Sequence, residues 1–320
     1  MGLTIEMARF LAKACQPRGA IGSVLTLGRQ HLSTSPERVR QLLVEQGFWP
    51  PPGGEAQFNE LMADPATRFE GFARGLGATR VASCDASAYE GASLTHDLNL
   101  PVPADWHEGF DAVIDSGTLE HVFNFPVAIA NCMNLVRTGG RLFVFTPANN
   151  YFGHGFYQFS PELFYRVLAH ENGFRIERMV ARANYEAVSS LGGIAYPFFK
   201  STRPYAVRDP NDVRQRVTLI NDLPILLFIE ARKVARVEVL KNCPQQSDYV
   251  VQWKEADAAK APAAQTYAHP VVNWLRRHFS EQTCRELIPS LARLLDPFRW
   301  ARYVRRHSFR NRRMYEPGED

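Results

Sequence analysis

A strand, a helix and a second strand follow one another in the middle of the chain, and this unit constrains the fold most. The segments "FDAVIDS" (110–116) and "RLFVFTP" (141–147) are short apolar runs typical of buried strands. Between them, Ile129, Met133 and Val136 share one face of a predicted helix, which a Gly-Gly pair ends. Strands joined by a helix run parallel with a right-handed crossover, so the unit predicts an open sheet with helices on both faces.

The same alternation fills about the first two thirds of the chain. Helices predicted over 35–47 and 160–173 both begin with Ser-Pro-Glu, which supplies an N-cap and a proline at the first helical position, and both end at a glycine. Further strands are predicted at 23–28, before Asp85, before Asp97, at 174–183 and at 224–234. The pattern predicts an α/β fold with a Rossmann-like, doubly wound sheet.

Polar residues or glycine end four of these strands. In open α/β sheets ligands bind outside the carboxyl ends of the strands, so Gly28, Asp85, Asp97 and Asp115 are expected to be neighbours in space. A carboxylate can accept hydrogen bonds from both hydroxyls of a ribose, which suits Asp85, and Asp97 can accept one from an exocyclic amine such as that of adenine. The alternative is that each aspartate only caps a turn. Two aspartates behind one glycine-bearing turn favour cofactor binding.

Composition indicates a soluble globular protein. The 320 residues are 45% hydrophobic and 22% charged, and the longest strongly apolar run, Pro224–Ile229, is far shorter than the ~20 residues of a membrane span. Glu6, Arg9 and Lys13 interrupt the N-terminal apolar positions, so we expect an amphipathic helix there and no signal peptide. The 5 cysteines are scattered without a CxxC pair, which predicts a reduced, cytoplasmic compartment.

Changes in composition divide the chain into four segments. These are an N-terminal helix at 1–19, a main domain at 20–240 with insertions at about 48–77 and 185–222, a linker at 241–270, and a basic helical tail at 271–320. The first insertion is rich in Pro and Gly and is expected to be irregular; the second is either a lid or recognition loop, or local core.

The net charge of +4 belongs to the tail, because Arg299 to Arg313 contain seven arginines while only three acidic residues follow them. Aromatic residues lie between these arginines. The tail is therefore compatible with weak contact to RNA or to an anionic membrane surface, and also with a solvated helix face that covers the domain.

Four stretches of the chain resemble the class I S-adenosylmethionine-dependent methyltransferases of the type 11/23 kind. They are "VLTLG", "SCDASAYEG", "HDLNLPVP" and "FDAVIDSGTLEHVFNFPVAIANCMNLVRTGGRLFVFTPANN", and the likeness covers about residues 20–235. The resemblance implies a seven-stranded, mainly parallel sheet whose last strand is antiparallel, with S-adenosyl-L-methionine as the cofactor.

The resemblance also implies the cofactor contacts. They would come from the turns after the first four strands: Gly28 at the methionine moiety, Asp85 with Ala86 at the ribose, Asp97 with Leu98 at the adenine, and Asp115 with Ser116 beside the sulfonium.

The first of these turns departs from the family pattern. The family usually has an acidic residue where this chain has Thr26, and glycines where it has Arg29 and Gln30. Since S-adenosylmethionine carries no phosphate, a strict glycine-rich amide cradle is not required. Arg29 can meet the carboxylate of the cofactor, whereas its ammonium needs an acceptor other than the missing acid.

Two histidines are the candidates for catalysis. His154 lies in "GHGFYQFS" just after the strand at 141–147 and is the first candidate for a general base, because a neutral imidazole can take the proton of an acceptor hydroxyl. His121 is the second candidate, and Glu120 is expected to support the loop. Some relatives hold a metal with an E-x-x-E-H pattern. The first glutamate is Gly117 here, so no metal is expected, although Asp115, Glu120, His121 and His154 offer O- and N-type ligands that could assemble a site.

These residues predict a methyltransferase that acts on oxygen of a small molecule or glycan precursor, since no Asn/Asp-Pro-Pro-Tyr motif of amino-group methylases follows the fourth strand. The alternative is a catalytically inactive scaffold of the same fold, or a sensor of S-adenosylmethionine or nucleosides. A dinucleotide-dependent oxidoreductase is less favoured because no G-x-G-x-x-G follows the first strand.

Overall fold

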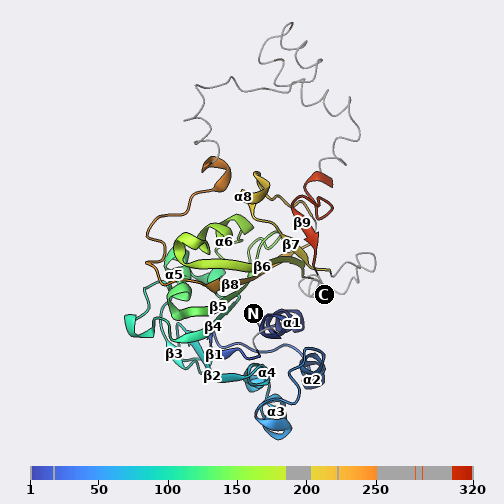
Figure 1. Cartoon of the computed structure of the whole chain (residues 1–320), viewed down its shortest axis with the longest axis vertical. Coiled ribbons are helices and arrows are strands. Elements are labelled where there is room, and N and C mark those ends of the chain that lie inside the picture. Colours follow the sequence, from blue (N-terminus) through green and yellow to red (C-terminus); the bar gives the residue numbers. More distant parts are fainter. Residues whose placement is uncertain are drawn as a thin grey trace.

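The computed structural model describes residues 2–16, 19–184, 203–221, 223–250, 278, 283 and 305–318. Their strands form one nine-stranded sheet in the order β3-β2-β1-β4-β5-β8-β6-β7-β9 (Figure 1). The strands are β1 (Gly22–Leu27), β2 (Ala78–Asp85), β3 (Leu94–Thr95), β4 (Phe110–Ser116), β5 (Val136–Pro147), β6 (Phe174–Ala183), β7 (Tyr205–Val207), β8 (Ile225–Lys233) and β9 (Tyr315–Pro317).

The strand directions confirm the predicted fold class. Strands β3, β2, β1, β4 and β5 run parallel to one another, and β8 is antiparallel to both β5 and β6. These seven strands make the mainly parallel sheet with an antiparallel last strand. The short strands β7 and β9 extend it beyond β6 by antiparallel pairing, which the sequence pattern does not predict.

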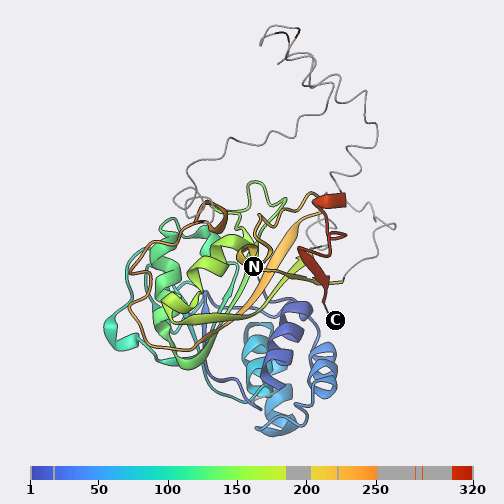
Figure 2. The same ribbon diagram turned by 45° about the horizontal axis from the view of Figure 1, so that its top comes forward.

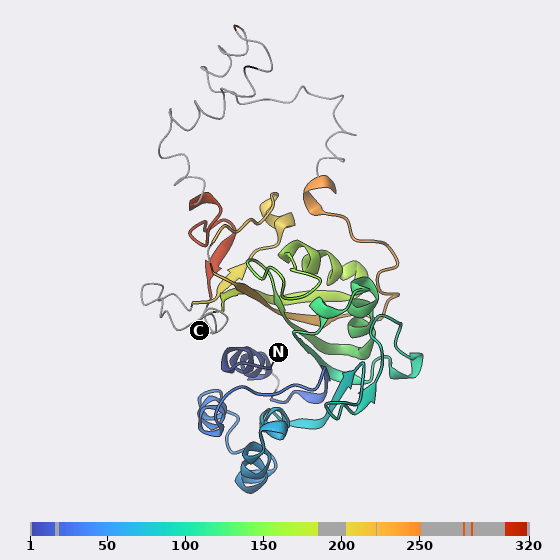
Figure 3. The same ribbon diagram turned by 180° about the vertical axis from the view of Figure 1, so that it is seen from behind.

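Helices cover both faces of the sheet, as Figures 1–3 show from three directions. One face is covered by α1 (Ile5–Cys15), α2 (Pro36–Glu45) and α4 (Arg68–Gly75), with α3 (Gly54–Ala63) beyond them, and the other by α5 (Phe125–Leu135) and α6 (Pro161–Val167). Four-residue α8 (Pro210–Val213) precedes β8.

The central strands divide their side chains between these two faces. In β5, Phe143 and Phe145 pack with α1, whereas Leu142 and Val144 pack with α5. Alternation of side chains along a strand explains this division, because successive residues point to opposite faces. Because both faces of the sheet are buried, polar groups that bind a ligand are expected at the carboxyl ends of the strands.

Two predictions about these elements are wrong. Helix α5 ends at Leu135, and Val136 begins β5, where it pairs with Phe110; pairing between distant strands is not visible to helical periodicity. The insertion at 48–77 is not irregular, since α3 and α4 lie in it with buried Phe58 and Phe72. The third strand ends at Thr95, close to Asp97 as expected, and Asp97 lies in the turn that follows.

Parts of the predicted segments lie outside the described residues. These parts include 185–202 of the second insertion, most of the linker at 241–270 and most of the tail at 271–320. The described end of the tail contains β9, which pairs with β7. No helix among the described residues is both long and apolar enough to span a membrane.

A buried charge cluster fixes α1 to the sheet. Glu230 on β8 accepts a hydrogen bond from Arg178 Nε at 2.9 Å and lies 3.8 Å from Arg141 Nη1. Both arginines also form hydrogen bonds with α1: Arg178 donates to the carbonyl of Phe10, and Arg141 donates to the carbonyl of Ala14. The carboxylate of Glu230 therefore compensates the charge of the cationic groups that hold the helix.

We expect Glu230→Ala to lower the free energy of unfolding by about 3–5 kcal/mol, because it leaves the buried Arg141 guanidinium without its counter-charge. Urea denaturation measures the change. The matched control is Glu238→Ala, whose side chain is 72% exposed and pairs only with Lys241; it should change stability by less than about 0.5 kcal/mol. Equal losses in the two variants would contradict the role of Glu230.

Candidate active site

The turn after β1 is held by backbone and side-chain hydrogen bonds. Gly28 has a φ of +68°, and its N–H donates to the carbonyl of Cys84 at 2.7 Å. Thr26 is buried and donates its hydroxyl to the carbonyl of Gly28 at 2.7 Å. Thr26 therefore stabilises the turn from within, at the position where the resembling family carries an acid.

Asp85 lies beside this turn. A Cβ atom at Gly28 would be 3.4 Å from Thr118 Oγ1 and 3.9 Å from Asp85 Oδ2, so the missing side chain leaves room between them. Asp85 Oδ1 accepts a hydrogen bond from the N–H of Ala86 at 2.6 Å. Within the described residues, Asp85 Oδ2 accepts no protein hydrogen bond and is available to a ligand.

Gln30 lies beside the Gly28 turn, and the sequence pattern does not reveal its burial. Its side chain is buried, and Nε2 donates to the carbonyl of Leu27 at 2.7 Å. Its Oε1 is also buried and has no hydrogen-bond partner among the residues that the structure describes. Nε2 is 3.6 Å from the position that a Cβ atom of Gly28 would take, so the amide belongs to the same turn. Only its burial beside Gly28 distinguishes it from a surface glutamine.

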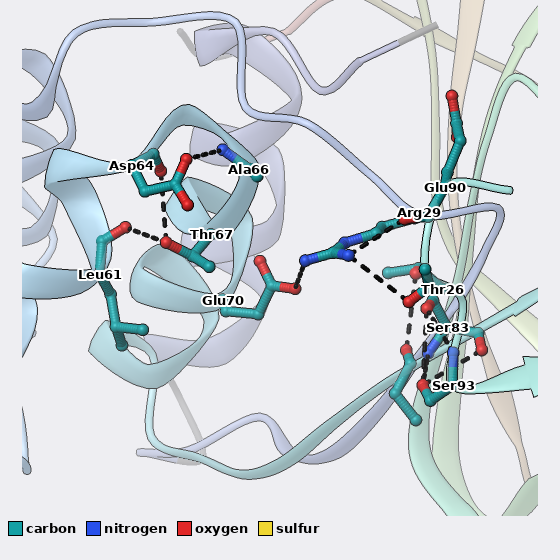
Figure 4. A network of polar contacts seen from close by, with 12 residues as sticks. Thr26, Arg29, Leu61, Asp64, Ala66, Thr67, Glu70, Ser83, Glu90 and Ser93 are labelled. Carbon is teal, nitrogen blue, oxygen red and sulfur yellow. Dashed lines mark hydrogen bonds and ion pairs between the residues drawn. The ribbon is translucent and has the colours of Figure 1, made fainter. Parts of the chain in front are cut away.

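The side chain of Arg29 is turned toward protein partners (Figure 4). Its Nη1 donates to the carbonyls of Glu90 at 3.0 Å and Gly91 at 3.5 Å, and its Nη2 lies 4.0 Å from Glu70 on α4. A contact between Arg29 and a cofactor carboxylate stays a prediction, and it would add to or replace these contacts.

The residues after β3 form a local turn. Asp97 is exposed, and its Oδ1 accepts hydrogen bonds from the backbone and side-chain nitrogens of Asn99 at 2.9 and 2.8 Å. These bonds hold the pKa of Asp97 below its usual value. Leu98 is buried, and its carbonyl accepts from Asn131 of α5 at 3.3 Å. The turn-capping role of Asp97 is thus observed, and its contact with adenine stays a prediction.

Asp115 and Ser116 lie below the surface of the turn after β4. Asp115 is fully buried, and its Oδ1 accepts the N–H groups of Thr118 and Leu119 at 3.0 and 3.2 Å. Ser116 Oγ points to the sulfur of Met7 on α1 at 3.6 Å. These two side chains shape the turn, so contact with a cofactor here would be made by the turn that they hold in place.

Glu120, His121 and His154 lie close together at the end of β4 and β5. Glu120 is fully buried on the 3-10 turn Leu119–His121, and its Oε2 accepts from Thr146 Oγ1 at 3.4 Å. His154 Nε2 lies 3.7 Å from Glu120 Oε1, and the rings of His121 and His154 are 5.2 Å apart. The structure therefore brings together all three predicted catalytic residues.

The backbone of Glu120 fixes the loop that carries His154. The carbonyl of Glu120 accepts hydrogen bonds from the N–H groups of Phe156 and Tyr157 at 2.9 and 3.3 Å. Gly155 permits this approach, because a Cβ atom there would be 2.8 Å from the same carbonyl oxygen. The loop after β5 is thereby held over Glu120.

Burial controls the protonation of this cluster. It raises the pKa of Glu120 to about 7 and lowers the pKa of both His121 and His154. The histidines are therefore neutral near pH 7. The contact between His154 and Glu120 is then not an ion pair between two full charges. A neutral imidazole can accept a proton or bind a metal ion.

A cavity of about 330 Å³ opens at the other end of the same loop. Gln158 and Phe159 of this loop are among its walls, together with Leu219, Ile225 and Tyr315. Gln158 also accepts a hydrogen bond from the N–H of Tyr151 at 2.9 Å.

The raised pKa of Asp115, caused mainly by burial and then by Glu120, has a consequence for stability. The unfolded chain releases this proton at the ordinary pKa, whereas the folded chain retains it, so the free energy of unfolding falls as pH rises above the ordinary value. Asp115→Asn removes this component. We expect its stability relative to the wild type to increase between about pH 4 and pH 8, as measured by urea denaturation at both pH values.

Asp105→Asn, on the exposed 3-10 segment Ala104–Trp106, is the control for this experiment. A difference between wild type and Asp115→Asn that does not change with pH would contradict the prediction.

The fold resembles several solved structures at low identity. No protein-family model and no curated protein matches the chain. A 1,6-didemethyltoxoflavin-N1-methyltransferase from Burkholderia thailandensis, with bound S-adenosylhomocysteine, is 15% identical with a TM-score of 0.36, over 72% of this chain and 78% of that one. A 16S rRNA (adenine(1408)-N(1))-methyltransferase from Catenulisporales acidiphilia is 10% identical with a TM-score of 0.32, over 72% and 94%.

A branched-chain polyamine synthase from Thermus thermophilus, in complex with 5'-methylthioadenosine, is 14% identical with a TM-score of 0.37, over 76% of this chain and 59% of that one.

Proposed function

We propose that this protein is an S-adenosylmethionine-dependent methyltransferase that methylates an oxygen of a small molecule or glycan precursor. The observation that carries the proposal is the position of Gly28 and Asp85 at the point where the strand order reverses. β1 lies between β2 and β4, the chain continues from β1 to β2 on one side and from β4 to β5 on the other, and ligands bind in the crevice at such a switch point.

The residues around Gly28 fit the cofactor. Among the described residues, Asp85 Oδ2 has no partner, and it can accept from ribose hydroxyls. Gln30 Oε1, buried beside the turn and unpaired within the same residues, supplies an acceptor where Thr26 replaces the expected acid. We therefore assign the ammonium group of the cofactor to the Gln30 side of the turn. A bound S-adenosylmethionine supplies a methyl group on a positively charged sulfur.

Glu120 and His154 serve the acceptor side. Methyl transfer breaks the bond between sulfur and the methyl carbon and forms a bond from the acceptor oxygen to that carbon, while the hydroxyl proton leaves. The chain contributes by orienting the hydroxyl and assisting loss of its proton. His154 is 31% exposed, neutral, and held over Glu120 by the fixed loop, so it can meet a hydroxyl that enters from solvent. The cavity at the other end of this loop, with apolar walls such as Leu219 and Ile225 beside polar Asn149 and Gln158, suits the remainder of such an acceptor.

We expect Asp85→Ala to weaken binding of S-adenosylmethionine by roughly 10- to 150-fold, because a hydrogen bond to a charged group contributes about 1.5–3 kcal/mol. Calorimetric titration with S-adenosylmethionine and S-adenosylhomocysteine measures this change. Asp105→Ala, on an exposed segment, is the matched control. If the wild type binds neither compound at millimolar concentration, the methyltransferase proposal is wrong and a scaffold role becomes the better explanation.

We expect His154→Ala to reduce turnover by about 10²- to 10⁴-fold while the affinity for S-adenosylmethionine changes by less than about twofold. The assay measures release of S-adenosylhomocysteine in the presence of small hydroxylated acceptors. His107→Ala, an exposed histidine outside the cluster, should retain the wild-type rate. An unchanged rate in His154→Ala would remove this residue from catalysis.

A further inference from the structure

The carboxyl group of Glu120 is fully buried with one of its oxygens unused. Among the described residues, its Oε1 has no hydrogen-bond partner, and no lysine or arginine side chain forms an ion pair with it. Nε2 of His154 lies 3.7 Å from this oxygen. A buried acceptor atom without a partner is costly, and a bound cation would offset this cost.

The ligand atoms around Glu120 have the spacing that a metal ion needs. One atom from each of Glu120, His121 and His154 lies within 4.8 Å of the other two. Bonds of ~2.0–2.2 Å from one ion to nitrogen and oxygen ligands place those ligands roughly 3–3.5 Å apart. The 3.7 Å between Glu120 Oε1 and His154 Nε2 is already near this value, so small side-chain rotations would complete the site.

The surroundings of the three residues resemble those of metal ligands. Thr146 Oγ1 donates to Glu120 Oε2 and so orients the carboxylate from behind. The loop of His154 is fixed to the carbonyl of Glu120, and the ring of Tyr151 packs edge-on against His154 at 5.5 Å. His121 is exposed, which gives an ion a route of entry from solvent.

The donor set selects the kind of ion. Two imidazole nitrogens and one carboxylate oxygen suit zinc and divalent transition metals such as manganese, iron and cobalt, whereas magnesium and calcium prefer oxygen ligands alone. Three protein ligands also leave at least one coordination position for water or a substrate oxygen.

We propose that Glu120, His121 and His154 bind one zinc or divalent transition-metal ion, whose open position takes the acceptor oxygen. This proposal departs from the expectation of no metal, which rested on Gly117; the chain offers three ligands without that position. The ion would lower the pKa of the bound hydroxyl, so that its proton leaves to solvent and the oxygen attacks as an anion. His154 then acts as a ligand. Only this catalytic role rests on the proposed function.

Metal binding can be tested without cofactor or acceptor. The full chain, free of any histidine tag and treated with a chelator, is titrated with Zn²⁺ and with Mn²⁺ in a calorimeter. We expect one ion per chain, and an affinity at least about tenfold lower in Glu120→Gln, His121→Ala and His154→Ala. His107→Ala, an exposed histidine elsewhere, should bind as the wild type does. Absence of binding, or equal affinity in all variants, would overturn the proposal.

A second variant separates ligand geometry from the loss of a ligand. Gly155→Ala retains all three ligands, but its Cβ atom would be 2.8 Å from the carbonyl oxygen of Glu120, so the His154 loop must move away. We expect weaker metal binding with the secondary structure retained in circular dichroism. Wild-type affinity in this variant would contradict the assigned geometry.

Metal binding and S-adenosylmethionine binding are measured separately, so the two proposals can fail independently. If S-adenosylmethionine binds and neither metal does, the metal site is wrong and the methyltransferase proposal stands. If a metal binds at the three residues and S-adenosylmethionine does not bind, the metal site stands and the proposed function fails.

Discussion

The central strands of this protein are buried on both faces, and the rest of the structure follows from that constraint. In β4, Ala112 and Ile114 pack toward α1, while Val113 packs toward α5. Each face must be covered by apolar helix surface, since exposing it would forfeit the hydrophobic free energy that drives folding. Apart from the cluster of Glu230, Arg141 and Arg178 under α1, the faces have little room for polar groups, and the polar groups of the candidate site lie at the carboxyl ends of the strands.

That region contains several polar atoms whose hydrogen-bonding capacity is not satisfied by the protein. In the part of the chain that the structure describes, Gln30 Oε1, Asp115 Oδ2, Glu120 Oε1 and His154 Nε2 are all buried and without a hydrogen-bond partner. Each such atom costs about 1–3 kcal/mol, which a fold retains where the atoms have another use. They form two groups, one around the turn of Gly28 and one under the loop of His154, and these match the two halves of a group-transfer site. The cofactor is proposed for the first and the acceptor, with its metal ion, for the second.

The two groups are linked through the turn that follows β4. The carboxyl group of Asp115 holds the N–H groups of Thr118 and Leu119, and Thr118 Oγ1 donates to the carbonyl of Leu27 in the first turn at 3.1 Å. The next residue along, Glu120, anchors the loop after β5. One short segment thus positions both halves of the site, and the burial of Asp115 and Glu120 within it keeps that segment in place.

The sequence by itself determined the strand pattern and the residues that end each strand. The apolar runs that form β1, β2 and β4 are local, so Gly28, Asp85 and Asp115 could be placed at one edge from chain order and sheet handedness alone. The pairing of His154 with Glu120 was less accessible, because only the loop closure through Gly155 brings these residues together.

Only the tertiary structure decided which polar groups are buried and which already have partners. It engages Thr26 and Arg29 with protein carbonyls, caps a turn with Asp97, buries Asp115, and leaves the amide oxygen of Gln30 unpaired. The physical reason is that the partners of these side chains come from segments far apart in the chain. Strand formation depends on neighbouring residues, whereas burial and hydrogen-bond satisfaction depend on the packing of the whole sheet edge.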